Sequence, residues 1–175
     1  VIGLAAITAL AFVFPSMIAD QIPSPTGPKL TGFVSDIGAV QDVVISPDGT
    51  KAYLASNPFG LVTLDISNIQ SPKVVGSQRP SVGPAGHLAL SPDGVTAVVT
   101  GTPRGTDIVD ISNPTLPKVL ASVAGTSVDA AFDEYYNAYI VTAGDVKVVE
   151  LTEPASPQVV TTLVTPGIAS GIAIS

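Results

Sequence analysis

The stretch LVTLDISNIQSPKVV, residues 61–75, decides the fold because two later stretches repeat its pattern. Its counterparts are IVDISNPTLPKVL at residues 108–120 and VKVVELTEPASPQVV at residues 146–160. Each copy has an apolar run, an acidic residue, a few turn-forming residues and a second apolar run. Repetition at a regular period is typical of an architecture assembled from copies of one structural unit.

A second motif, SPDG, recurs with the same period, at residues 46–49 and again at 91–94. Proline suits the first central position of a type I turn, and the glycine that follows accepts a positive φ. We therefore predict tight hairpin turns with Gly49 and Gly94 in left-handed conformations. A period of roughly 40–45 residues is typical of units that contain four short strands.

Stretches between these turns, such as residues 52–55, 97–99 and 139–141, are apolar on both alternating sides. Strands of this kind need cover on both faces, so the small sheets must stack face to face. A closed ring of blades and an open array both achieve this, and the ring is favoured because radial closure leaves only short, protected edges. We predict an all-β fold, a β-propeller of four-stranded blades.

Three complete blades are predicted, and they span about residues 42–78, 87–123 and 129–163. Residues 28–45 align without a gap with residues 157–174. This alignment predicts an outer strand at residues 29–35 and the start of a further blade at residues 171–175. Because three blades are too few to close with normal strand twist, we expect a fragment of a larger propeller.

The repeats resemble a known family at LDISN (64–68), VDISNP (109–114) and VELTEP (149–154). These segments resemble the LVIVD-repeat family, and the SPDG hairpins resemble the related YVTN propellers, over residues 28–175. The resemblance implies an exported or cell-surface β-propeller of a bacterium or archaeon, and it implies no particular activity. The third unit departs from the pattern, because Glu150 replaces the aspartate and DEYY at residues 133–136 replaces the hairpin turn.

The amino-terminal segment indicates export. Residues 1–14 are apolar except for Thr8, and Pro15 follows. A run of this length suits a signal peptide better than a membrane-spanning helix, which needs about 20 apolar residues. We predict that residues 1–19 form a signal peptide, with an uncleaved anchor and a buried helix as alternatives, and that residues 20–28 form a linker. The expected location is extracytoplasmic: periplasmic, secreted or on the cell surface, with membrane contact only through this segment.

Composition excludes several classes of function. The net charge is −7 with only seven Lys and Arg residues, so no basic stripe is present to bind nucleic acid. The absence of cysteine excludes disulfides, thiolate metal ligands and a thiol nucleophile. No cofactor or metal motif is recognisable, and none is predicted.

Two sets of polar residues stand out from the repeats. Asp65 and Asp110 lie at the ends of predicted strands just before Ser residues, where short carboxylates bind free backbone amides and fix a turn. Asp42, His87 and Asp129 occupy equivalent positions at the start of the innermost strands, and a ring would gather them on one rim of its channel. There they would bind a metal or polar ligand, or else remain solvated rim residues.

No catalytic residue is assigned, because the single histidine, His87, belongs to no recognisable Ser-His-Asp arrangement. The sequence favours an exported or cell-surface binding or scaffold module without enzymatic activity, whose ligand is unknown. The alternative is a propeller enzyme, either a lactonase-like hydrolase or a quinone-dependent dehydrogenase, with its site in further blades.

Overall fold

The computed structural model describes residues 30–79, 81, 83–101 and 105–174. The predicted signal segment and linker lie outside these residues. The described part forms twelve strands and contains no helix. It therefore offers no helix long and apolar enough to span a membrane.

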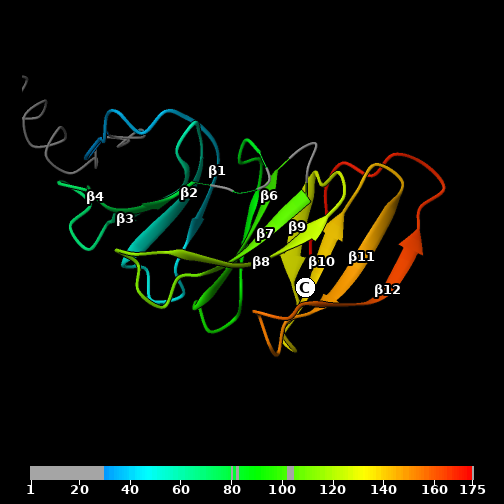
Figure 1. Ribbon diagram of the computed structural model, residues 1–175. Helices are drawn as coiled ribbons and strands as arrows, with labels where there is room; N and C mark the ends of the chain where they lie inside the picture. The colour runs from blue at the N-terminus through cyan, green and yellow to red at the C-terminus, as the bar shows by residue number, and fades with distance from the viewer. Residues whose placement is uncertain (1–29, 80, 82, 102–104, 175) are drawn as a thin grey trace, which may run out of the picture. The chain divides into compact units, whose positions relative to one another are not determined.

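The strands form three antiparallel four-stranded sheets, each a meander in chain order (Figure 1). The first sheet contains β1 (Ala39–Ile45), β2 (Lys51–Asn57), β3 (Gly60–Asp65) and β4 (Lys73–Gln78). The second contains β5 (Leu88–Leu90), β6 (Thr96–Gly101), β7 (Gly105–Asp110) and β8 (Lys118–Ala124). The third contains β9 (Asp129–Phe132), β10 (Asn137–Val141), β11 (Asp145–Glu150) and β12 (Gln158–Val164). The predicted all-β class of four-stranded blades is confirmed.

The SPDG stretches form the turns that join the first and second strands of their sheets. Gly49 and Gly94 both have φ of +71°, and their amides donate to the carbonyls of Ser46 (2.8 Å) and Ser91 (2.9 Å). The corresponding turn of the third sheet has no glycine, and Tyr136 takes the left-handed conformation there with φ of +66°. A bulky side chain is strained in that region.

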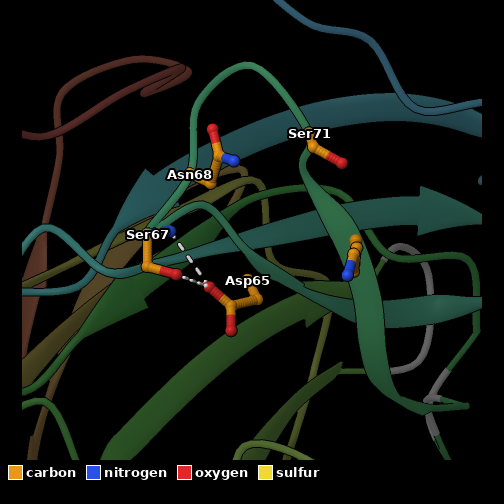
Figure 2. A pocket seen from close by; sticks show the side chains of 5 residues that line it. Asp65, Ser67, Asn68 and Ser71 are labelled. Carbon is orange, nitrogen blue, oxygen red and sulfur yellow. Dashed lines mark hydrogen bonds between the residues drawn. The ribbon is translucent and has the colours of Figure 1, made fainter.

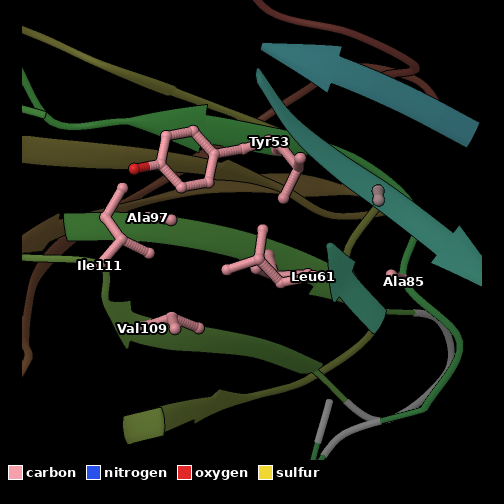
Figure 3. Close-up of a cluster of buried hydrophobic side chains, with 9 residues drawn as sticks. Tyr53, Leu61, Ala85, Ala97, Val109 and Ile111 are labelled. Carbon is pink, nitrogen blue, oxygen red and sulfur yellow. The ribbon is translucent and has the colours of Figure 1, made fainter. Parts of the chain in front are cut away.

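Apolar side chains fill the space between successive sheets. Between the first two, Tyr53 and Leu61 pack with Val109 and Ile111 (Figure 3). A second apolar cluster, which includes Ile108 and Ile140, fills the space between the second and third sheets. Fully burying a leucine, isoleucine or valine stabilises a fold by roughly 1.5–3 kcal/mol. Face-to-face burial is therefore the main interaction that holds the blades together.

The remaining face of the first sheet is covered by the segment that precedes β1. Val34 and Ile37 pack against an apolar cluster of that sheet that includes Leu54 and Val62. Gly32 lies so close to the loop after β3 that an added Cβ would stand 2.3 Å from the carbonyl oxygen of Ile69. This segment thus covers the apolar side chains on that face.

The expected outer strand at residues 29–35 is not observed in the described part, because residues 30–35 belong to none of the three sheets. Residues 171–174, expected to start a further first strand, also form no strand. A strand requires a paired neighbour to complete its hydrogen-bond ladder. No described strand pairs with either segment.

The two hairpin glycines allow a matched test of turn strain against packing. At Gly49 an added Cβ meets no atom within 4 Å, whereas at Gly94 it would stand 2.9 Å from Cδ of Pro47. Gly49→Ala should cost about 1–2 kcal/mol from backbone strain alone. Gly94→Ala should cost more, by roughly 1 kcal/mol, because the two turns would also clash. Urea denaturation of both variants checks this, and equal losses would contradict the close approach of the turns.

Candidate functional site

Asp42 and Asp129, two of the predicted rim residues, each join one blade to a later segment of the chain. Each uses Oδ1 to accept from the amide of the next residue, Val43 or Ala130, at 2.8 Å. Asp42 Oδ2 accepts from the amide of Leu88 in the second blade at 2.9 Å. Asp129 Oδ2 accepts from the amide of Ile172 at the same distance. We call these two arrangements the carboxylate links.

His87, the third predicted rim residue, lies directly before β5. Its Nδ1 stands 3.6 Å from Asp42 Oδ2, and 47% of its side chain is exposed. β5 lies beside both β1 and β9, so the starts of the innermost strands are neighbours. The structure therefore brings Asp42 and His87 together, but Asp42 lies within β1 and not at its start, whereas Asp129 begins β9.

The carboxylates of the predicted rim are already hydrogen-bonded within the protein. Asp42 and Asp129 each have both oxygens engaged by backbone amides. Among the described residues no group of three potential metal-ligating side chains converges. Ligand binding at Asp42, His87 and Asp129 remains a prediction, and any ligand there would compete with the carboxylate links.

Asp65, at the end of β3, organises the turn of the repeated motif and one wall of a small pocket (Figure 2). Its Oδ1 accepts from the amide of Ser67 at 3.0 Å and from the hydroxyl of Ser67 at 2.6 Å. The pocket, about 120 Å³, is lined by Asp65, Ser67, Asn68, Ser71 and Lys73. Its polar lining is largely occupied by turn hydrogen bonds.

In the two later turns of the repeated motif, an acidic side chain also accepts a hydrogen bond from the turn. Asp110 Oδ1 accepts from the amide of Ser112 at 2.9 Å, and Glu150 accepts from the hydroxyl of Thr152 at 3.1 Å. Glu150 thus contacts its turn through a hydroxyl, whereas Asp65 and Asp110 each accept from a backbone amide. Each of these acids therefore accepts a hydrogen bond from its own turn.

Hydrogen bonding lowers the pKa of the turn carboxylates. The hydroxyl of Ser46, followed by the amide of Thr50, lowers the pKa of Asp48 from 3.8 to about 2. The hydroxyl and then the amide of Ser67 lower the pKa of Asp65. In each case the protein donates to the ionised form, which favours the charged state.

Two grooves lie between successive blades at the end that carries these turns. The first groove, of about 300 Å³, is lined by Asp48, Lys51 and Tyr53 of the first sheet and by Asp93, Val95 and Ile111 of the second blade, among others. The second groove, of about 390 Å³, is lined by Asp93, Val95 and Thr96 of the second blade and by Tyr136, Leu151 and Pro154 of the third, among others. The same recess thus recurs at each described blade boundary.

Tyrosines in these grooves were not singled out by the sequence. Tyr136, in its strained conformation, has a raised pKa because of desolvation and then the charge of Asp93. Tyr53 has a raised pKa because of burial and then the charge of Asp48. The one available signal for Tyr136 was the missing glycine in the DEYY turn.

Asp107 is a further residue that the sequence did not reveal. It is fully buried in β7, and its carboxylate accepts from the amide of Ser81 at 2.6 Å. The hydroxyls of Ser81 and Ser122 also donate to it, at 2.5 and 2.6 Å. Buried carboxylates are tolerated when they are hydrogen-bonded in this way. Asp107 therefore fastens the loop between the first two blades.

Together, the stacked four-stranded sheets and the turn ends define a β-propeller module. A family model described as LVIVD repeat matches residues 37–79 and 103–125. These two segments therefore carry LVIVD repeats, which confirms the resemblance at the first two units. No curated protein matches the chain.

Solved structures share the fold. Hydrazine synthase of Kuenenia stuttgartiensis is similar with a TM-score of 0.62 and 19% identity, over 84% of this chain and 40% of that one. A functionally unknown protein of Desulfotomaculum acetoxidans is similar with a TM-score of 0.71 and 16% identity, over 87% of this chain and 50% of that one. A β-propeller domain from Myceliophteria thermophila is similar with a TM-score of 0.61 and 14% identity, over 75% of this chain and 45% of that one. The chain thus spans half or less of each of these structures, and the likeness shows the fold alone.

The lowered carboxylate pKa values predict a stability that depends on acid pH. Because the folded pKa of Asp48 (about 2) lies below its ordinary 3.8, its contribution is complete above about pH 4. That contribution is lost as the pH falls toward 2. Asp48→Asn should therefore lose less stability than the wild type between pH 4 and pH 2. Urea denaturation across this range measures the difference, and parallel curves for the two proteins would contradict the assignment.

Proposed function

We propose that the protein is an exported or cell-surface β-propeller that acts as a binding or scaffold module. The main support is how the conspicuous acids are used. Asp42 joins the first blade to the second, and Asp129 joins the third blade to the segment after β12. Asp65 and Asp110 hold turns. They serve the scaffold, while the recurring grooves provide a patterned surface for a partner.

The amino-terminal segment supports the location. Residues 1–14 form an apolar run closed by Pro15, as in the h-region of a signal peptide. We propose a periplasmic, secreted or surface-displayed protein with membrane contact only through residues 1–19, and no binding of nucleic acid.

An enzymatic role has one observation in its favour. His87 and Asp42 form an exposed imidazole–carboxylate pair at 3.6 Å, and such a pair can serve as a general base with its orienting group. Against this, Asp42 Oδ2 already accepts from the amide of Leu88. The second candidate is a lactonase-like hydrolase or a quinone-dependent dehydrogenase whose site lies mainly in further blades.

Binding and turnover can be separated in one set of assays on the full chain. We expect saturable binding to at least one member of an array of blocked peptides and cell-envelope polysaccharides. We expect no hydrolysis of a lactone and no alcohol oxidation with an added quinone. Turnover that His87→Ala abolishes would contradict the binding module and establish the enzyme instead.

Export can be tested independently of the ligand. Residues 1–28 fused to a phosphatase that is active only outside the cytoplasm should give active reporter in a bacterial host. The matched control replaces Leu10 and Phe12 by Asp, which breaks the apolar run and should leave the phosphatase inactive. An inactive fusion with the native segment would contradict the proposed location. Mass analysis of the exported fusion distinguishes cleavage near Ala19 from a retained anchor.

A further inference from the structure

Tyr53, at the first groove, carries a hydroxyl that the described protein does not use. Its side chain is only 3% exposed, and Figure 3 shows the hydroxyl at the edge of the apolar cluster beside Ile111. Within the described residues no hydrogen bond joins this hydroxyl to another group, although Tyr53 lines the groove. Phenylalanine would fill the same apolar space. Among the described residues, only Thr63 and Thr106 have a buried side-chain oxygen without a hydrogen-bond partner. The ring of Tyr53 is therefore buried while its hydroxyl is open to the groove, where a ligand can donate to it.

Asp48 and Asp93 flank the same groove. Asp48 Oδ1 accepts from the hydroxyl of Ser46 at 2.6 Å and from the amide of Thr50 at 2.9 Å. The hydroxyl of Thr50 also donates to Asp48, with its closer contact at Oδ2, 2.9 Å away. A carboxylate has about four acceptor positions. Asp48 therefore retains capacity for one more donor.

Asp93 is held in the same manner. Its Oδ1 accepts from the hydroxyl of Ser91 at 2.6 Å and from the amide of Val95 at 3.2 Å. Asp93 Oδ2 accepts no hydrogen bond from the described residues and is free to accept one from a ligand. The charges lining the groove are these two carboxylates and Lys51, whose ammonium stands 3.8 Å from Asp65.

Between the carboxylates the groove is apolar. Ile111 is buried at its base, and Val95 is 42% exposed along its wall. A ligand that fits must therefore combine an aliphatic stem with a positively charged group that donates several hydrogen bonds. The phenol oxygen of Tyr53 and the free positions on Asp48 and Asp93 all accept such donors.

We propose that the first groove binds the guanidinium group of an arginine in an extended segment of a partner protein, an inference that rests on the proposed binding function. Guanidinium has five N–H donors and no acceptor, so it can satisfy the phenol oxygen and both carboxylates at once. Its methylene stem packs along Val95 and Ile111. Lysine offers a compact ammonium with three donors and binds less well.

The test uses N-acetyl-Gly-Arg-Gly-amide as the probe and the isotope-labelled full chain as the target. Citrulline in place of arginine keeps the shape and removes the charge, and lysine keeps the charge and removes the planar group. Amide shifts should saturate for residues 48–53, 93–95 and 111–112. The arginine peptide should bind about tenfold more tightly than the citrulline peptide, because hydrogen bonds to charged groups are the strong ones.

Three variants assign the contact. Tyr53→Phe removes only the hydroxyl and should weaken binding about fivefold. Asp48→Asn removes one charge and should weaken it about tenfold. Asp36→Asn makes the same change of charge before β1, outside the groove, and should leave binding unchanged.

The proposal is overturned by equal affinity for the arginine and citrulline peptides, by shifts that map away from the groove, or by no saturable shift. It is also overturned if both Tyr53→Phe and Asp48→Asn bind as the wild type does. Binding of other array members without arginine preference would reject this groove assignment and leave the binding module standing. Enzymatic turnover would reject the binding module itself.

Discussion

Both faces of each four-stranded sheet are apolar, and the rest of the structure depends on covering them. Leu61 of the first sheet is 1% exposed, and Ile108 of the second and Val149 of the third are fully buried. A single sheet of this kind would expose a large apolar surface on at least one side. Stacking successive sheets removes that surface and also sets where loops, rims and grooves lie.

Hydrogen bonds add direction to this apolar packing. The carboxylate links from Asp42 and Asp129 each join one blade to a backbone amide of the following segment, and Asp107 ties the connecting loop to β7. Apolar contact alone tolerates sliding, whereas a carboxylate that accepts two amides has defined geometry. The links thus complement the packing by fixing the register between neighbours.

Local features of the fold could be predicted from the sequence. The repeat period predicted four strands in each unit, and the SPDG stretches predicted tight turns, because both depend on residues close together in the chain. The two carboxylate links could not be predicted. Asp42 bonds to an amide 46 residues away, and because every residue except proline has an amide, sequence carries no sign of the partner.

In the candidate site, too, the sequence predicted local positions but not contacts between distant residues. The sequence placed Asp42, His87 and Asp129 at equivalent strand starts, and the first two do lie within 3.6 Å. The sequence analysis treated Tyr53 as part of an apolar strand. That assignment is correct for the buried ring, but it did not predict where the hydroxyl lies. A side chain that belongs to the core at one end and to a groove at the other is recognised only after the second blade is in place.

The central claim is that successive LVIVD blades pack face to face, with Tyr53 of one against Ile111 of the next. Nuclear Overhauser contacts between the Tyr53 ring and the Ile111 methyl groups test this most directly. Strong cross-peaks are predicted, because the two side chains share one buried cluster although they lie far apart in sequence. Their absence from a folded sample with both residues assigned would contradict the stacked arrangement.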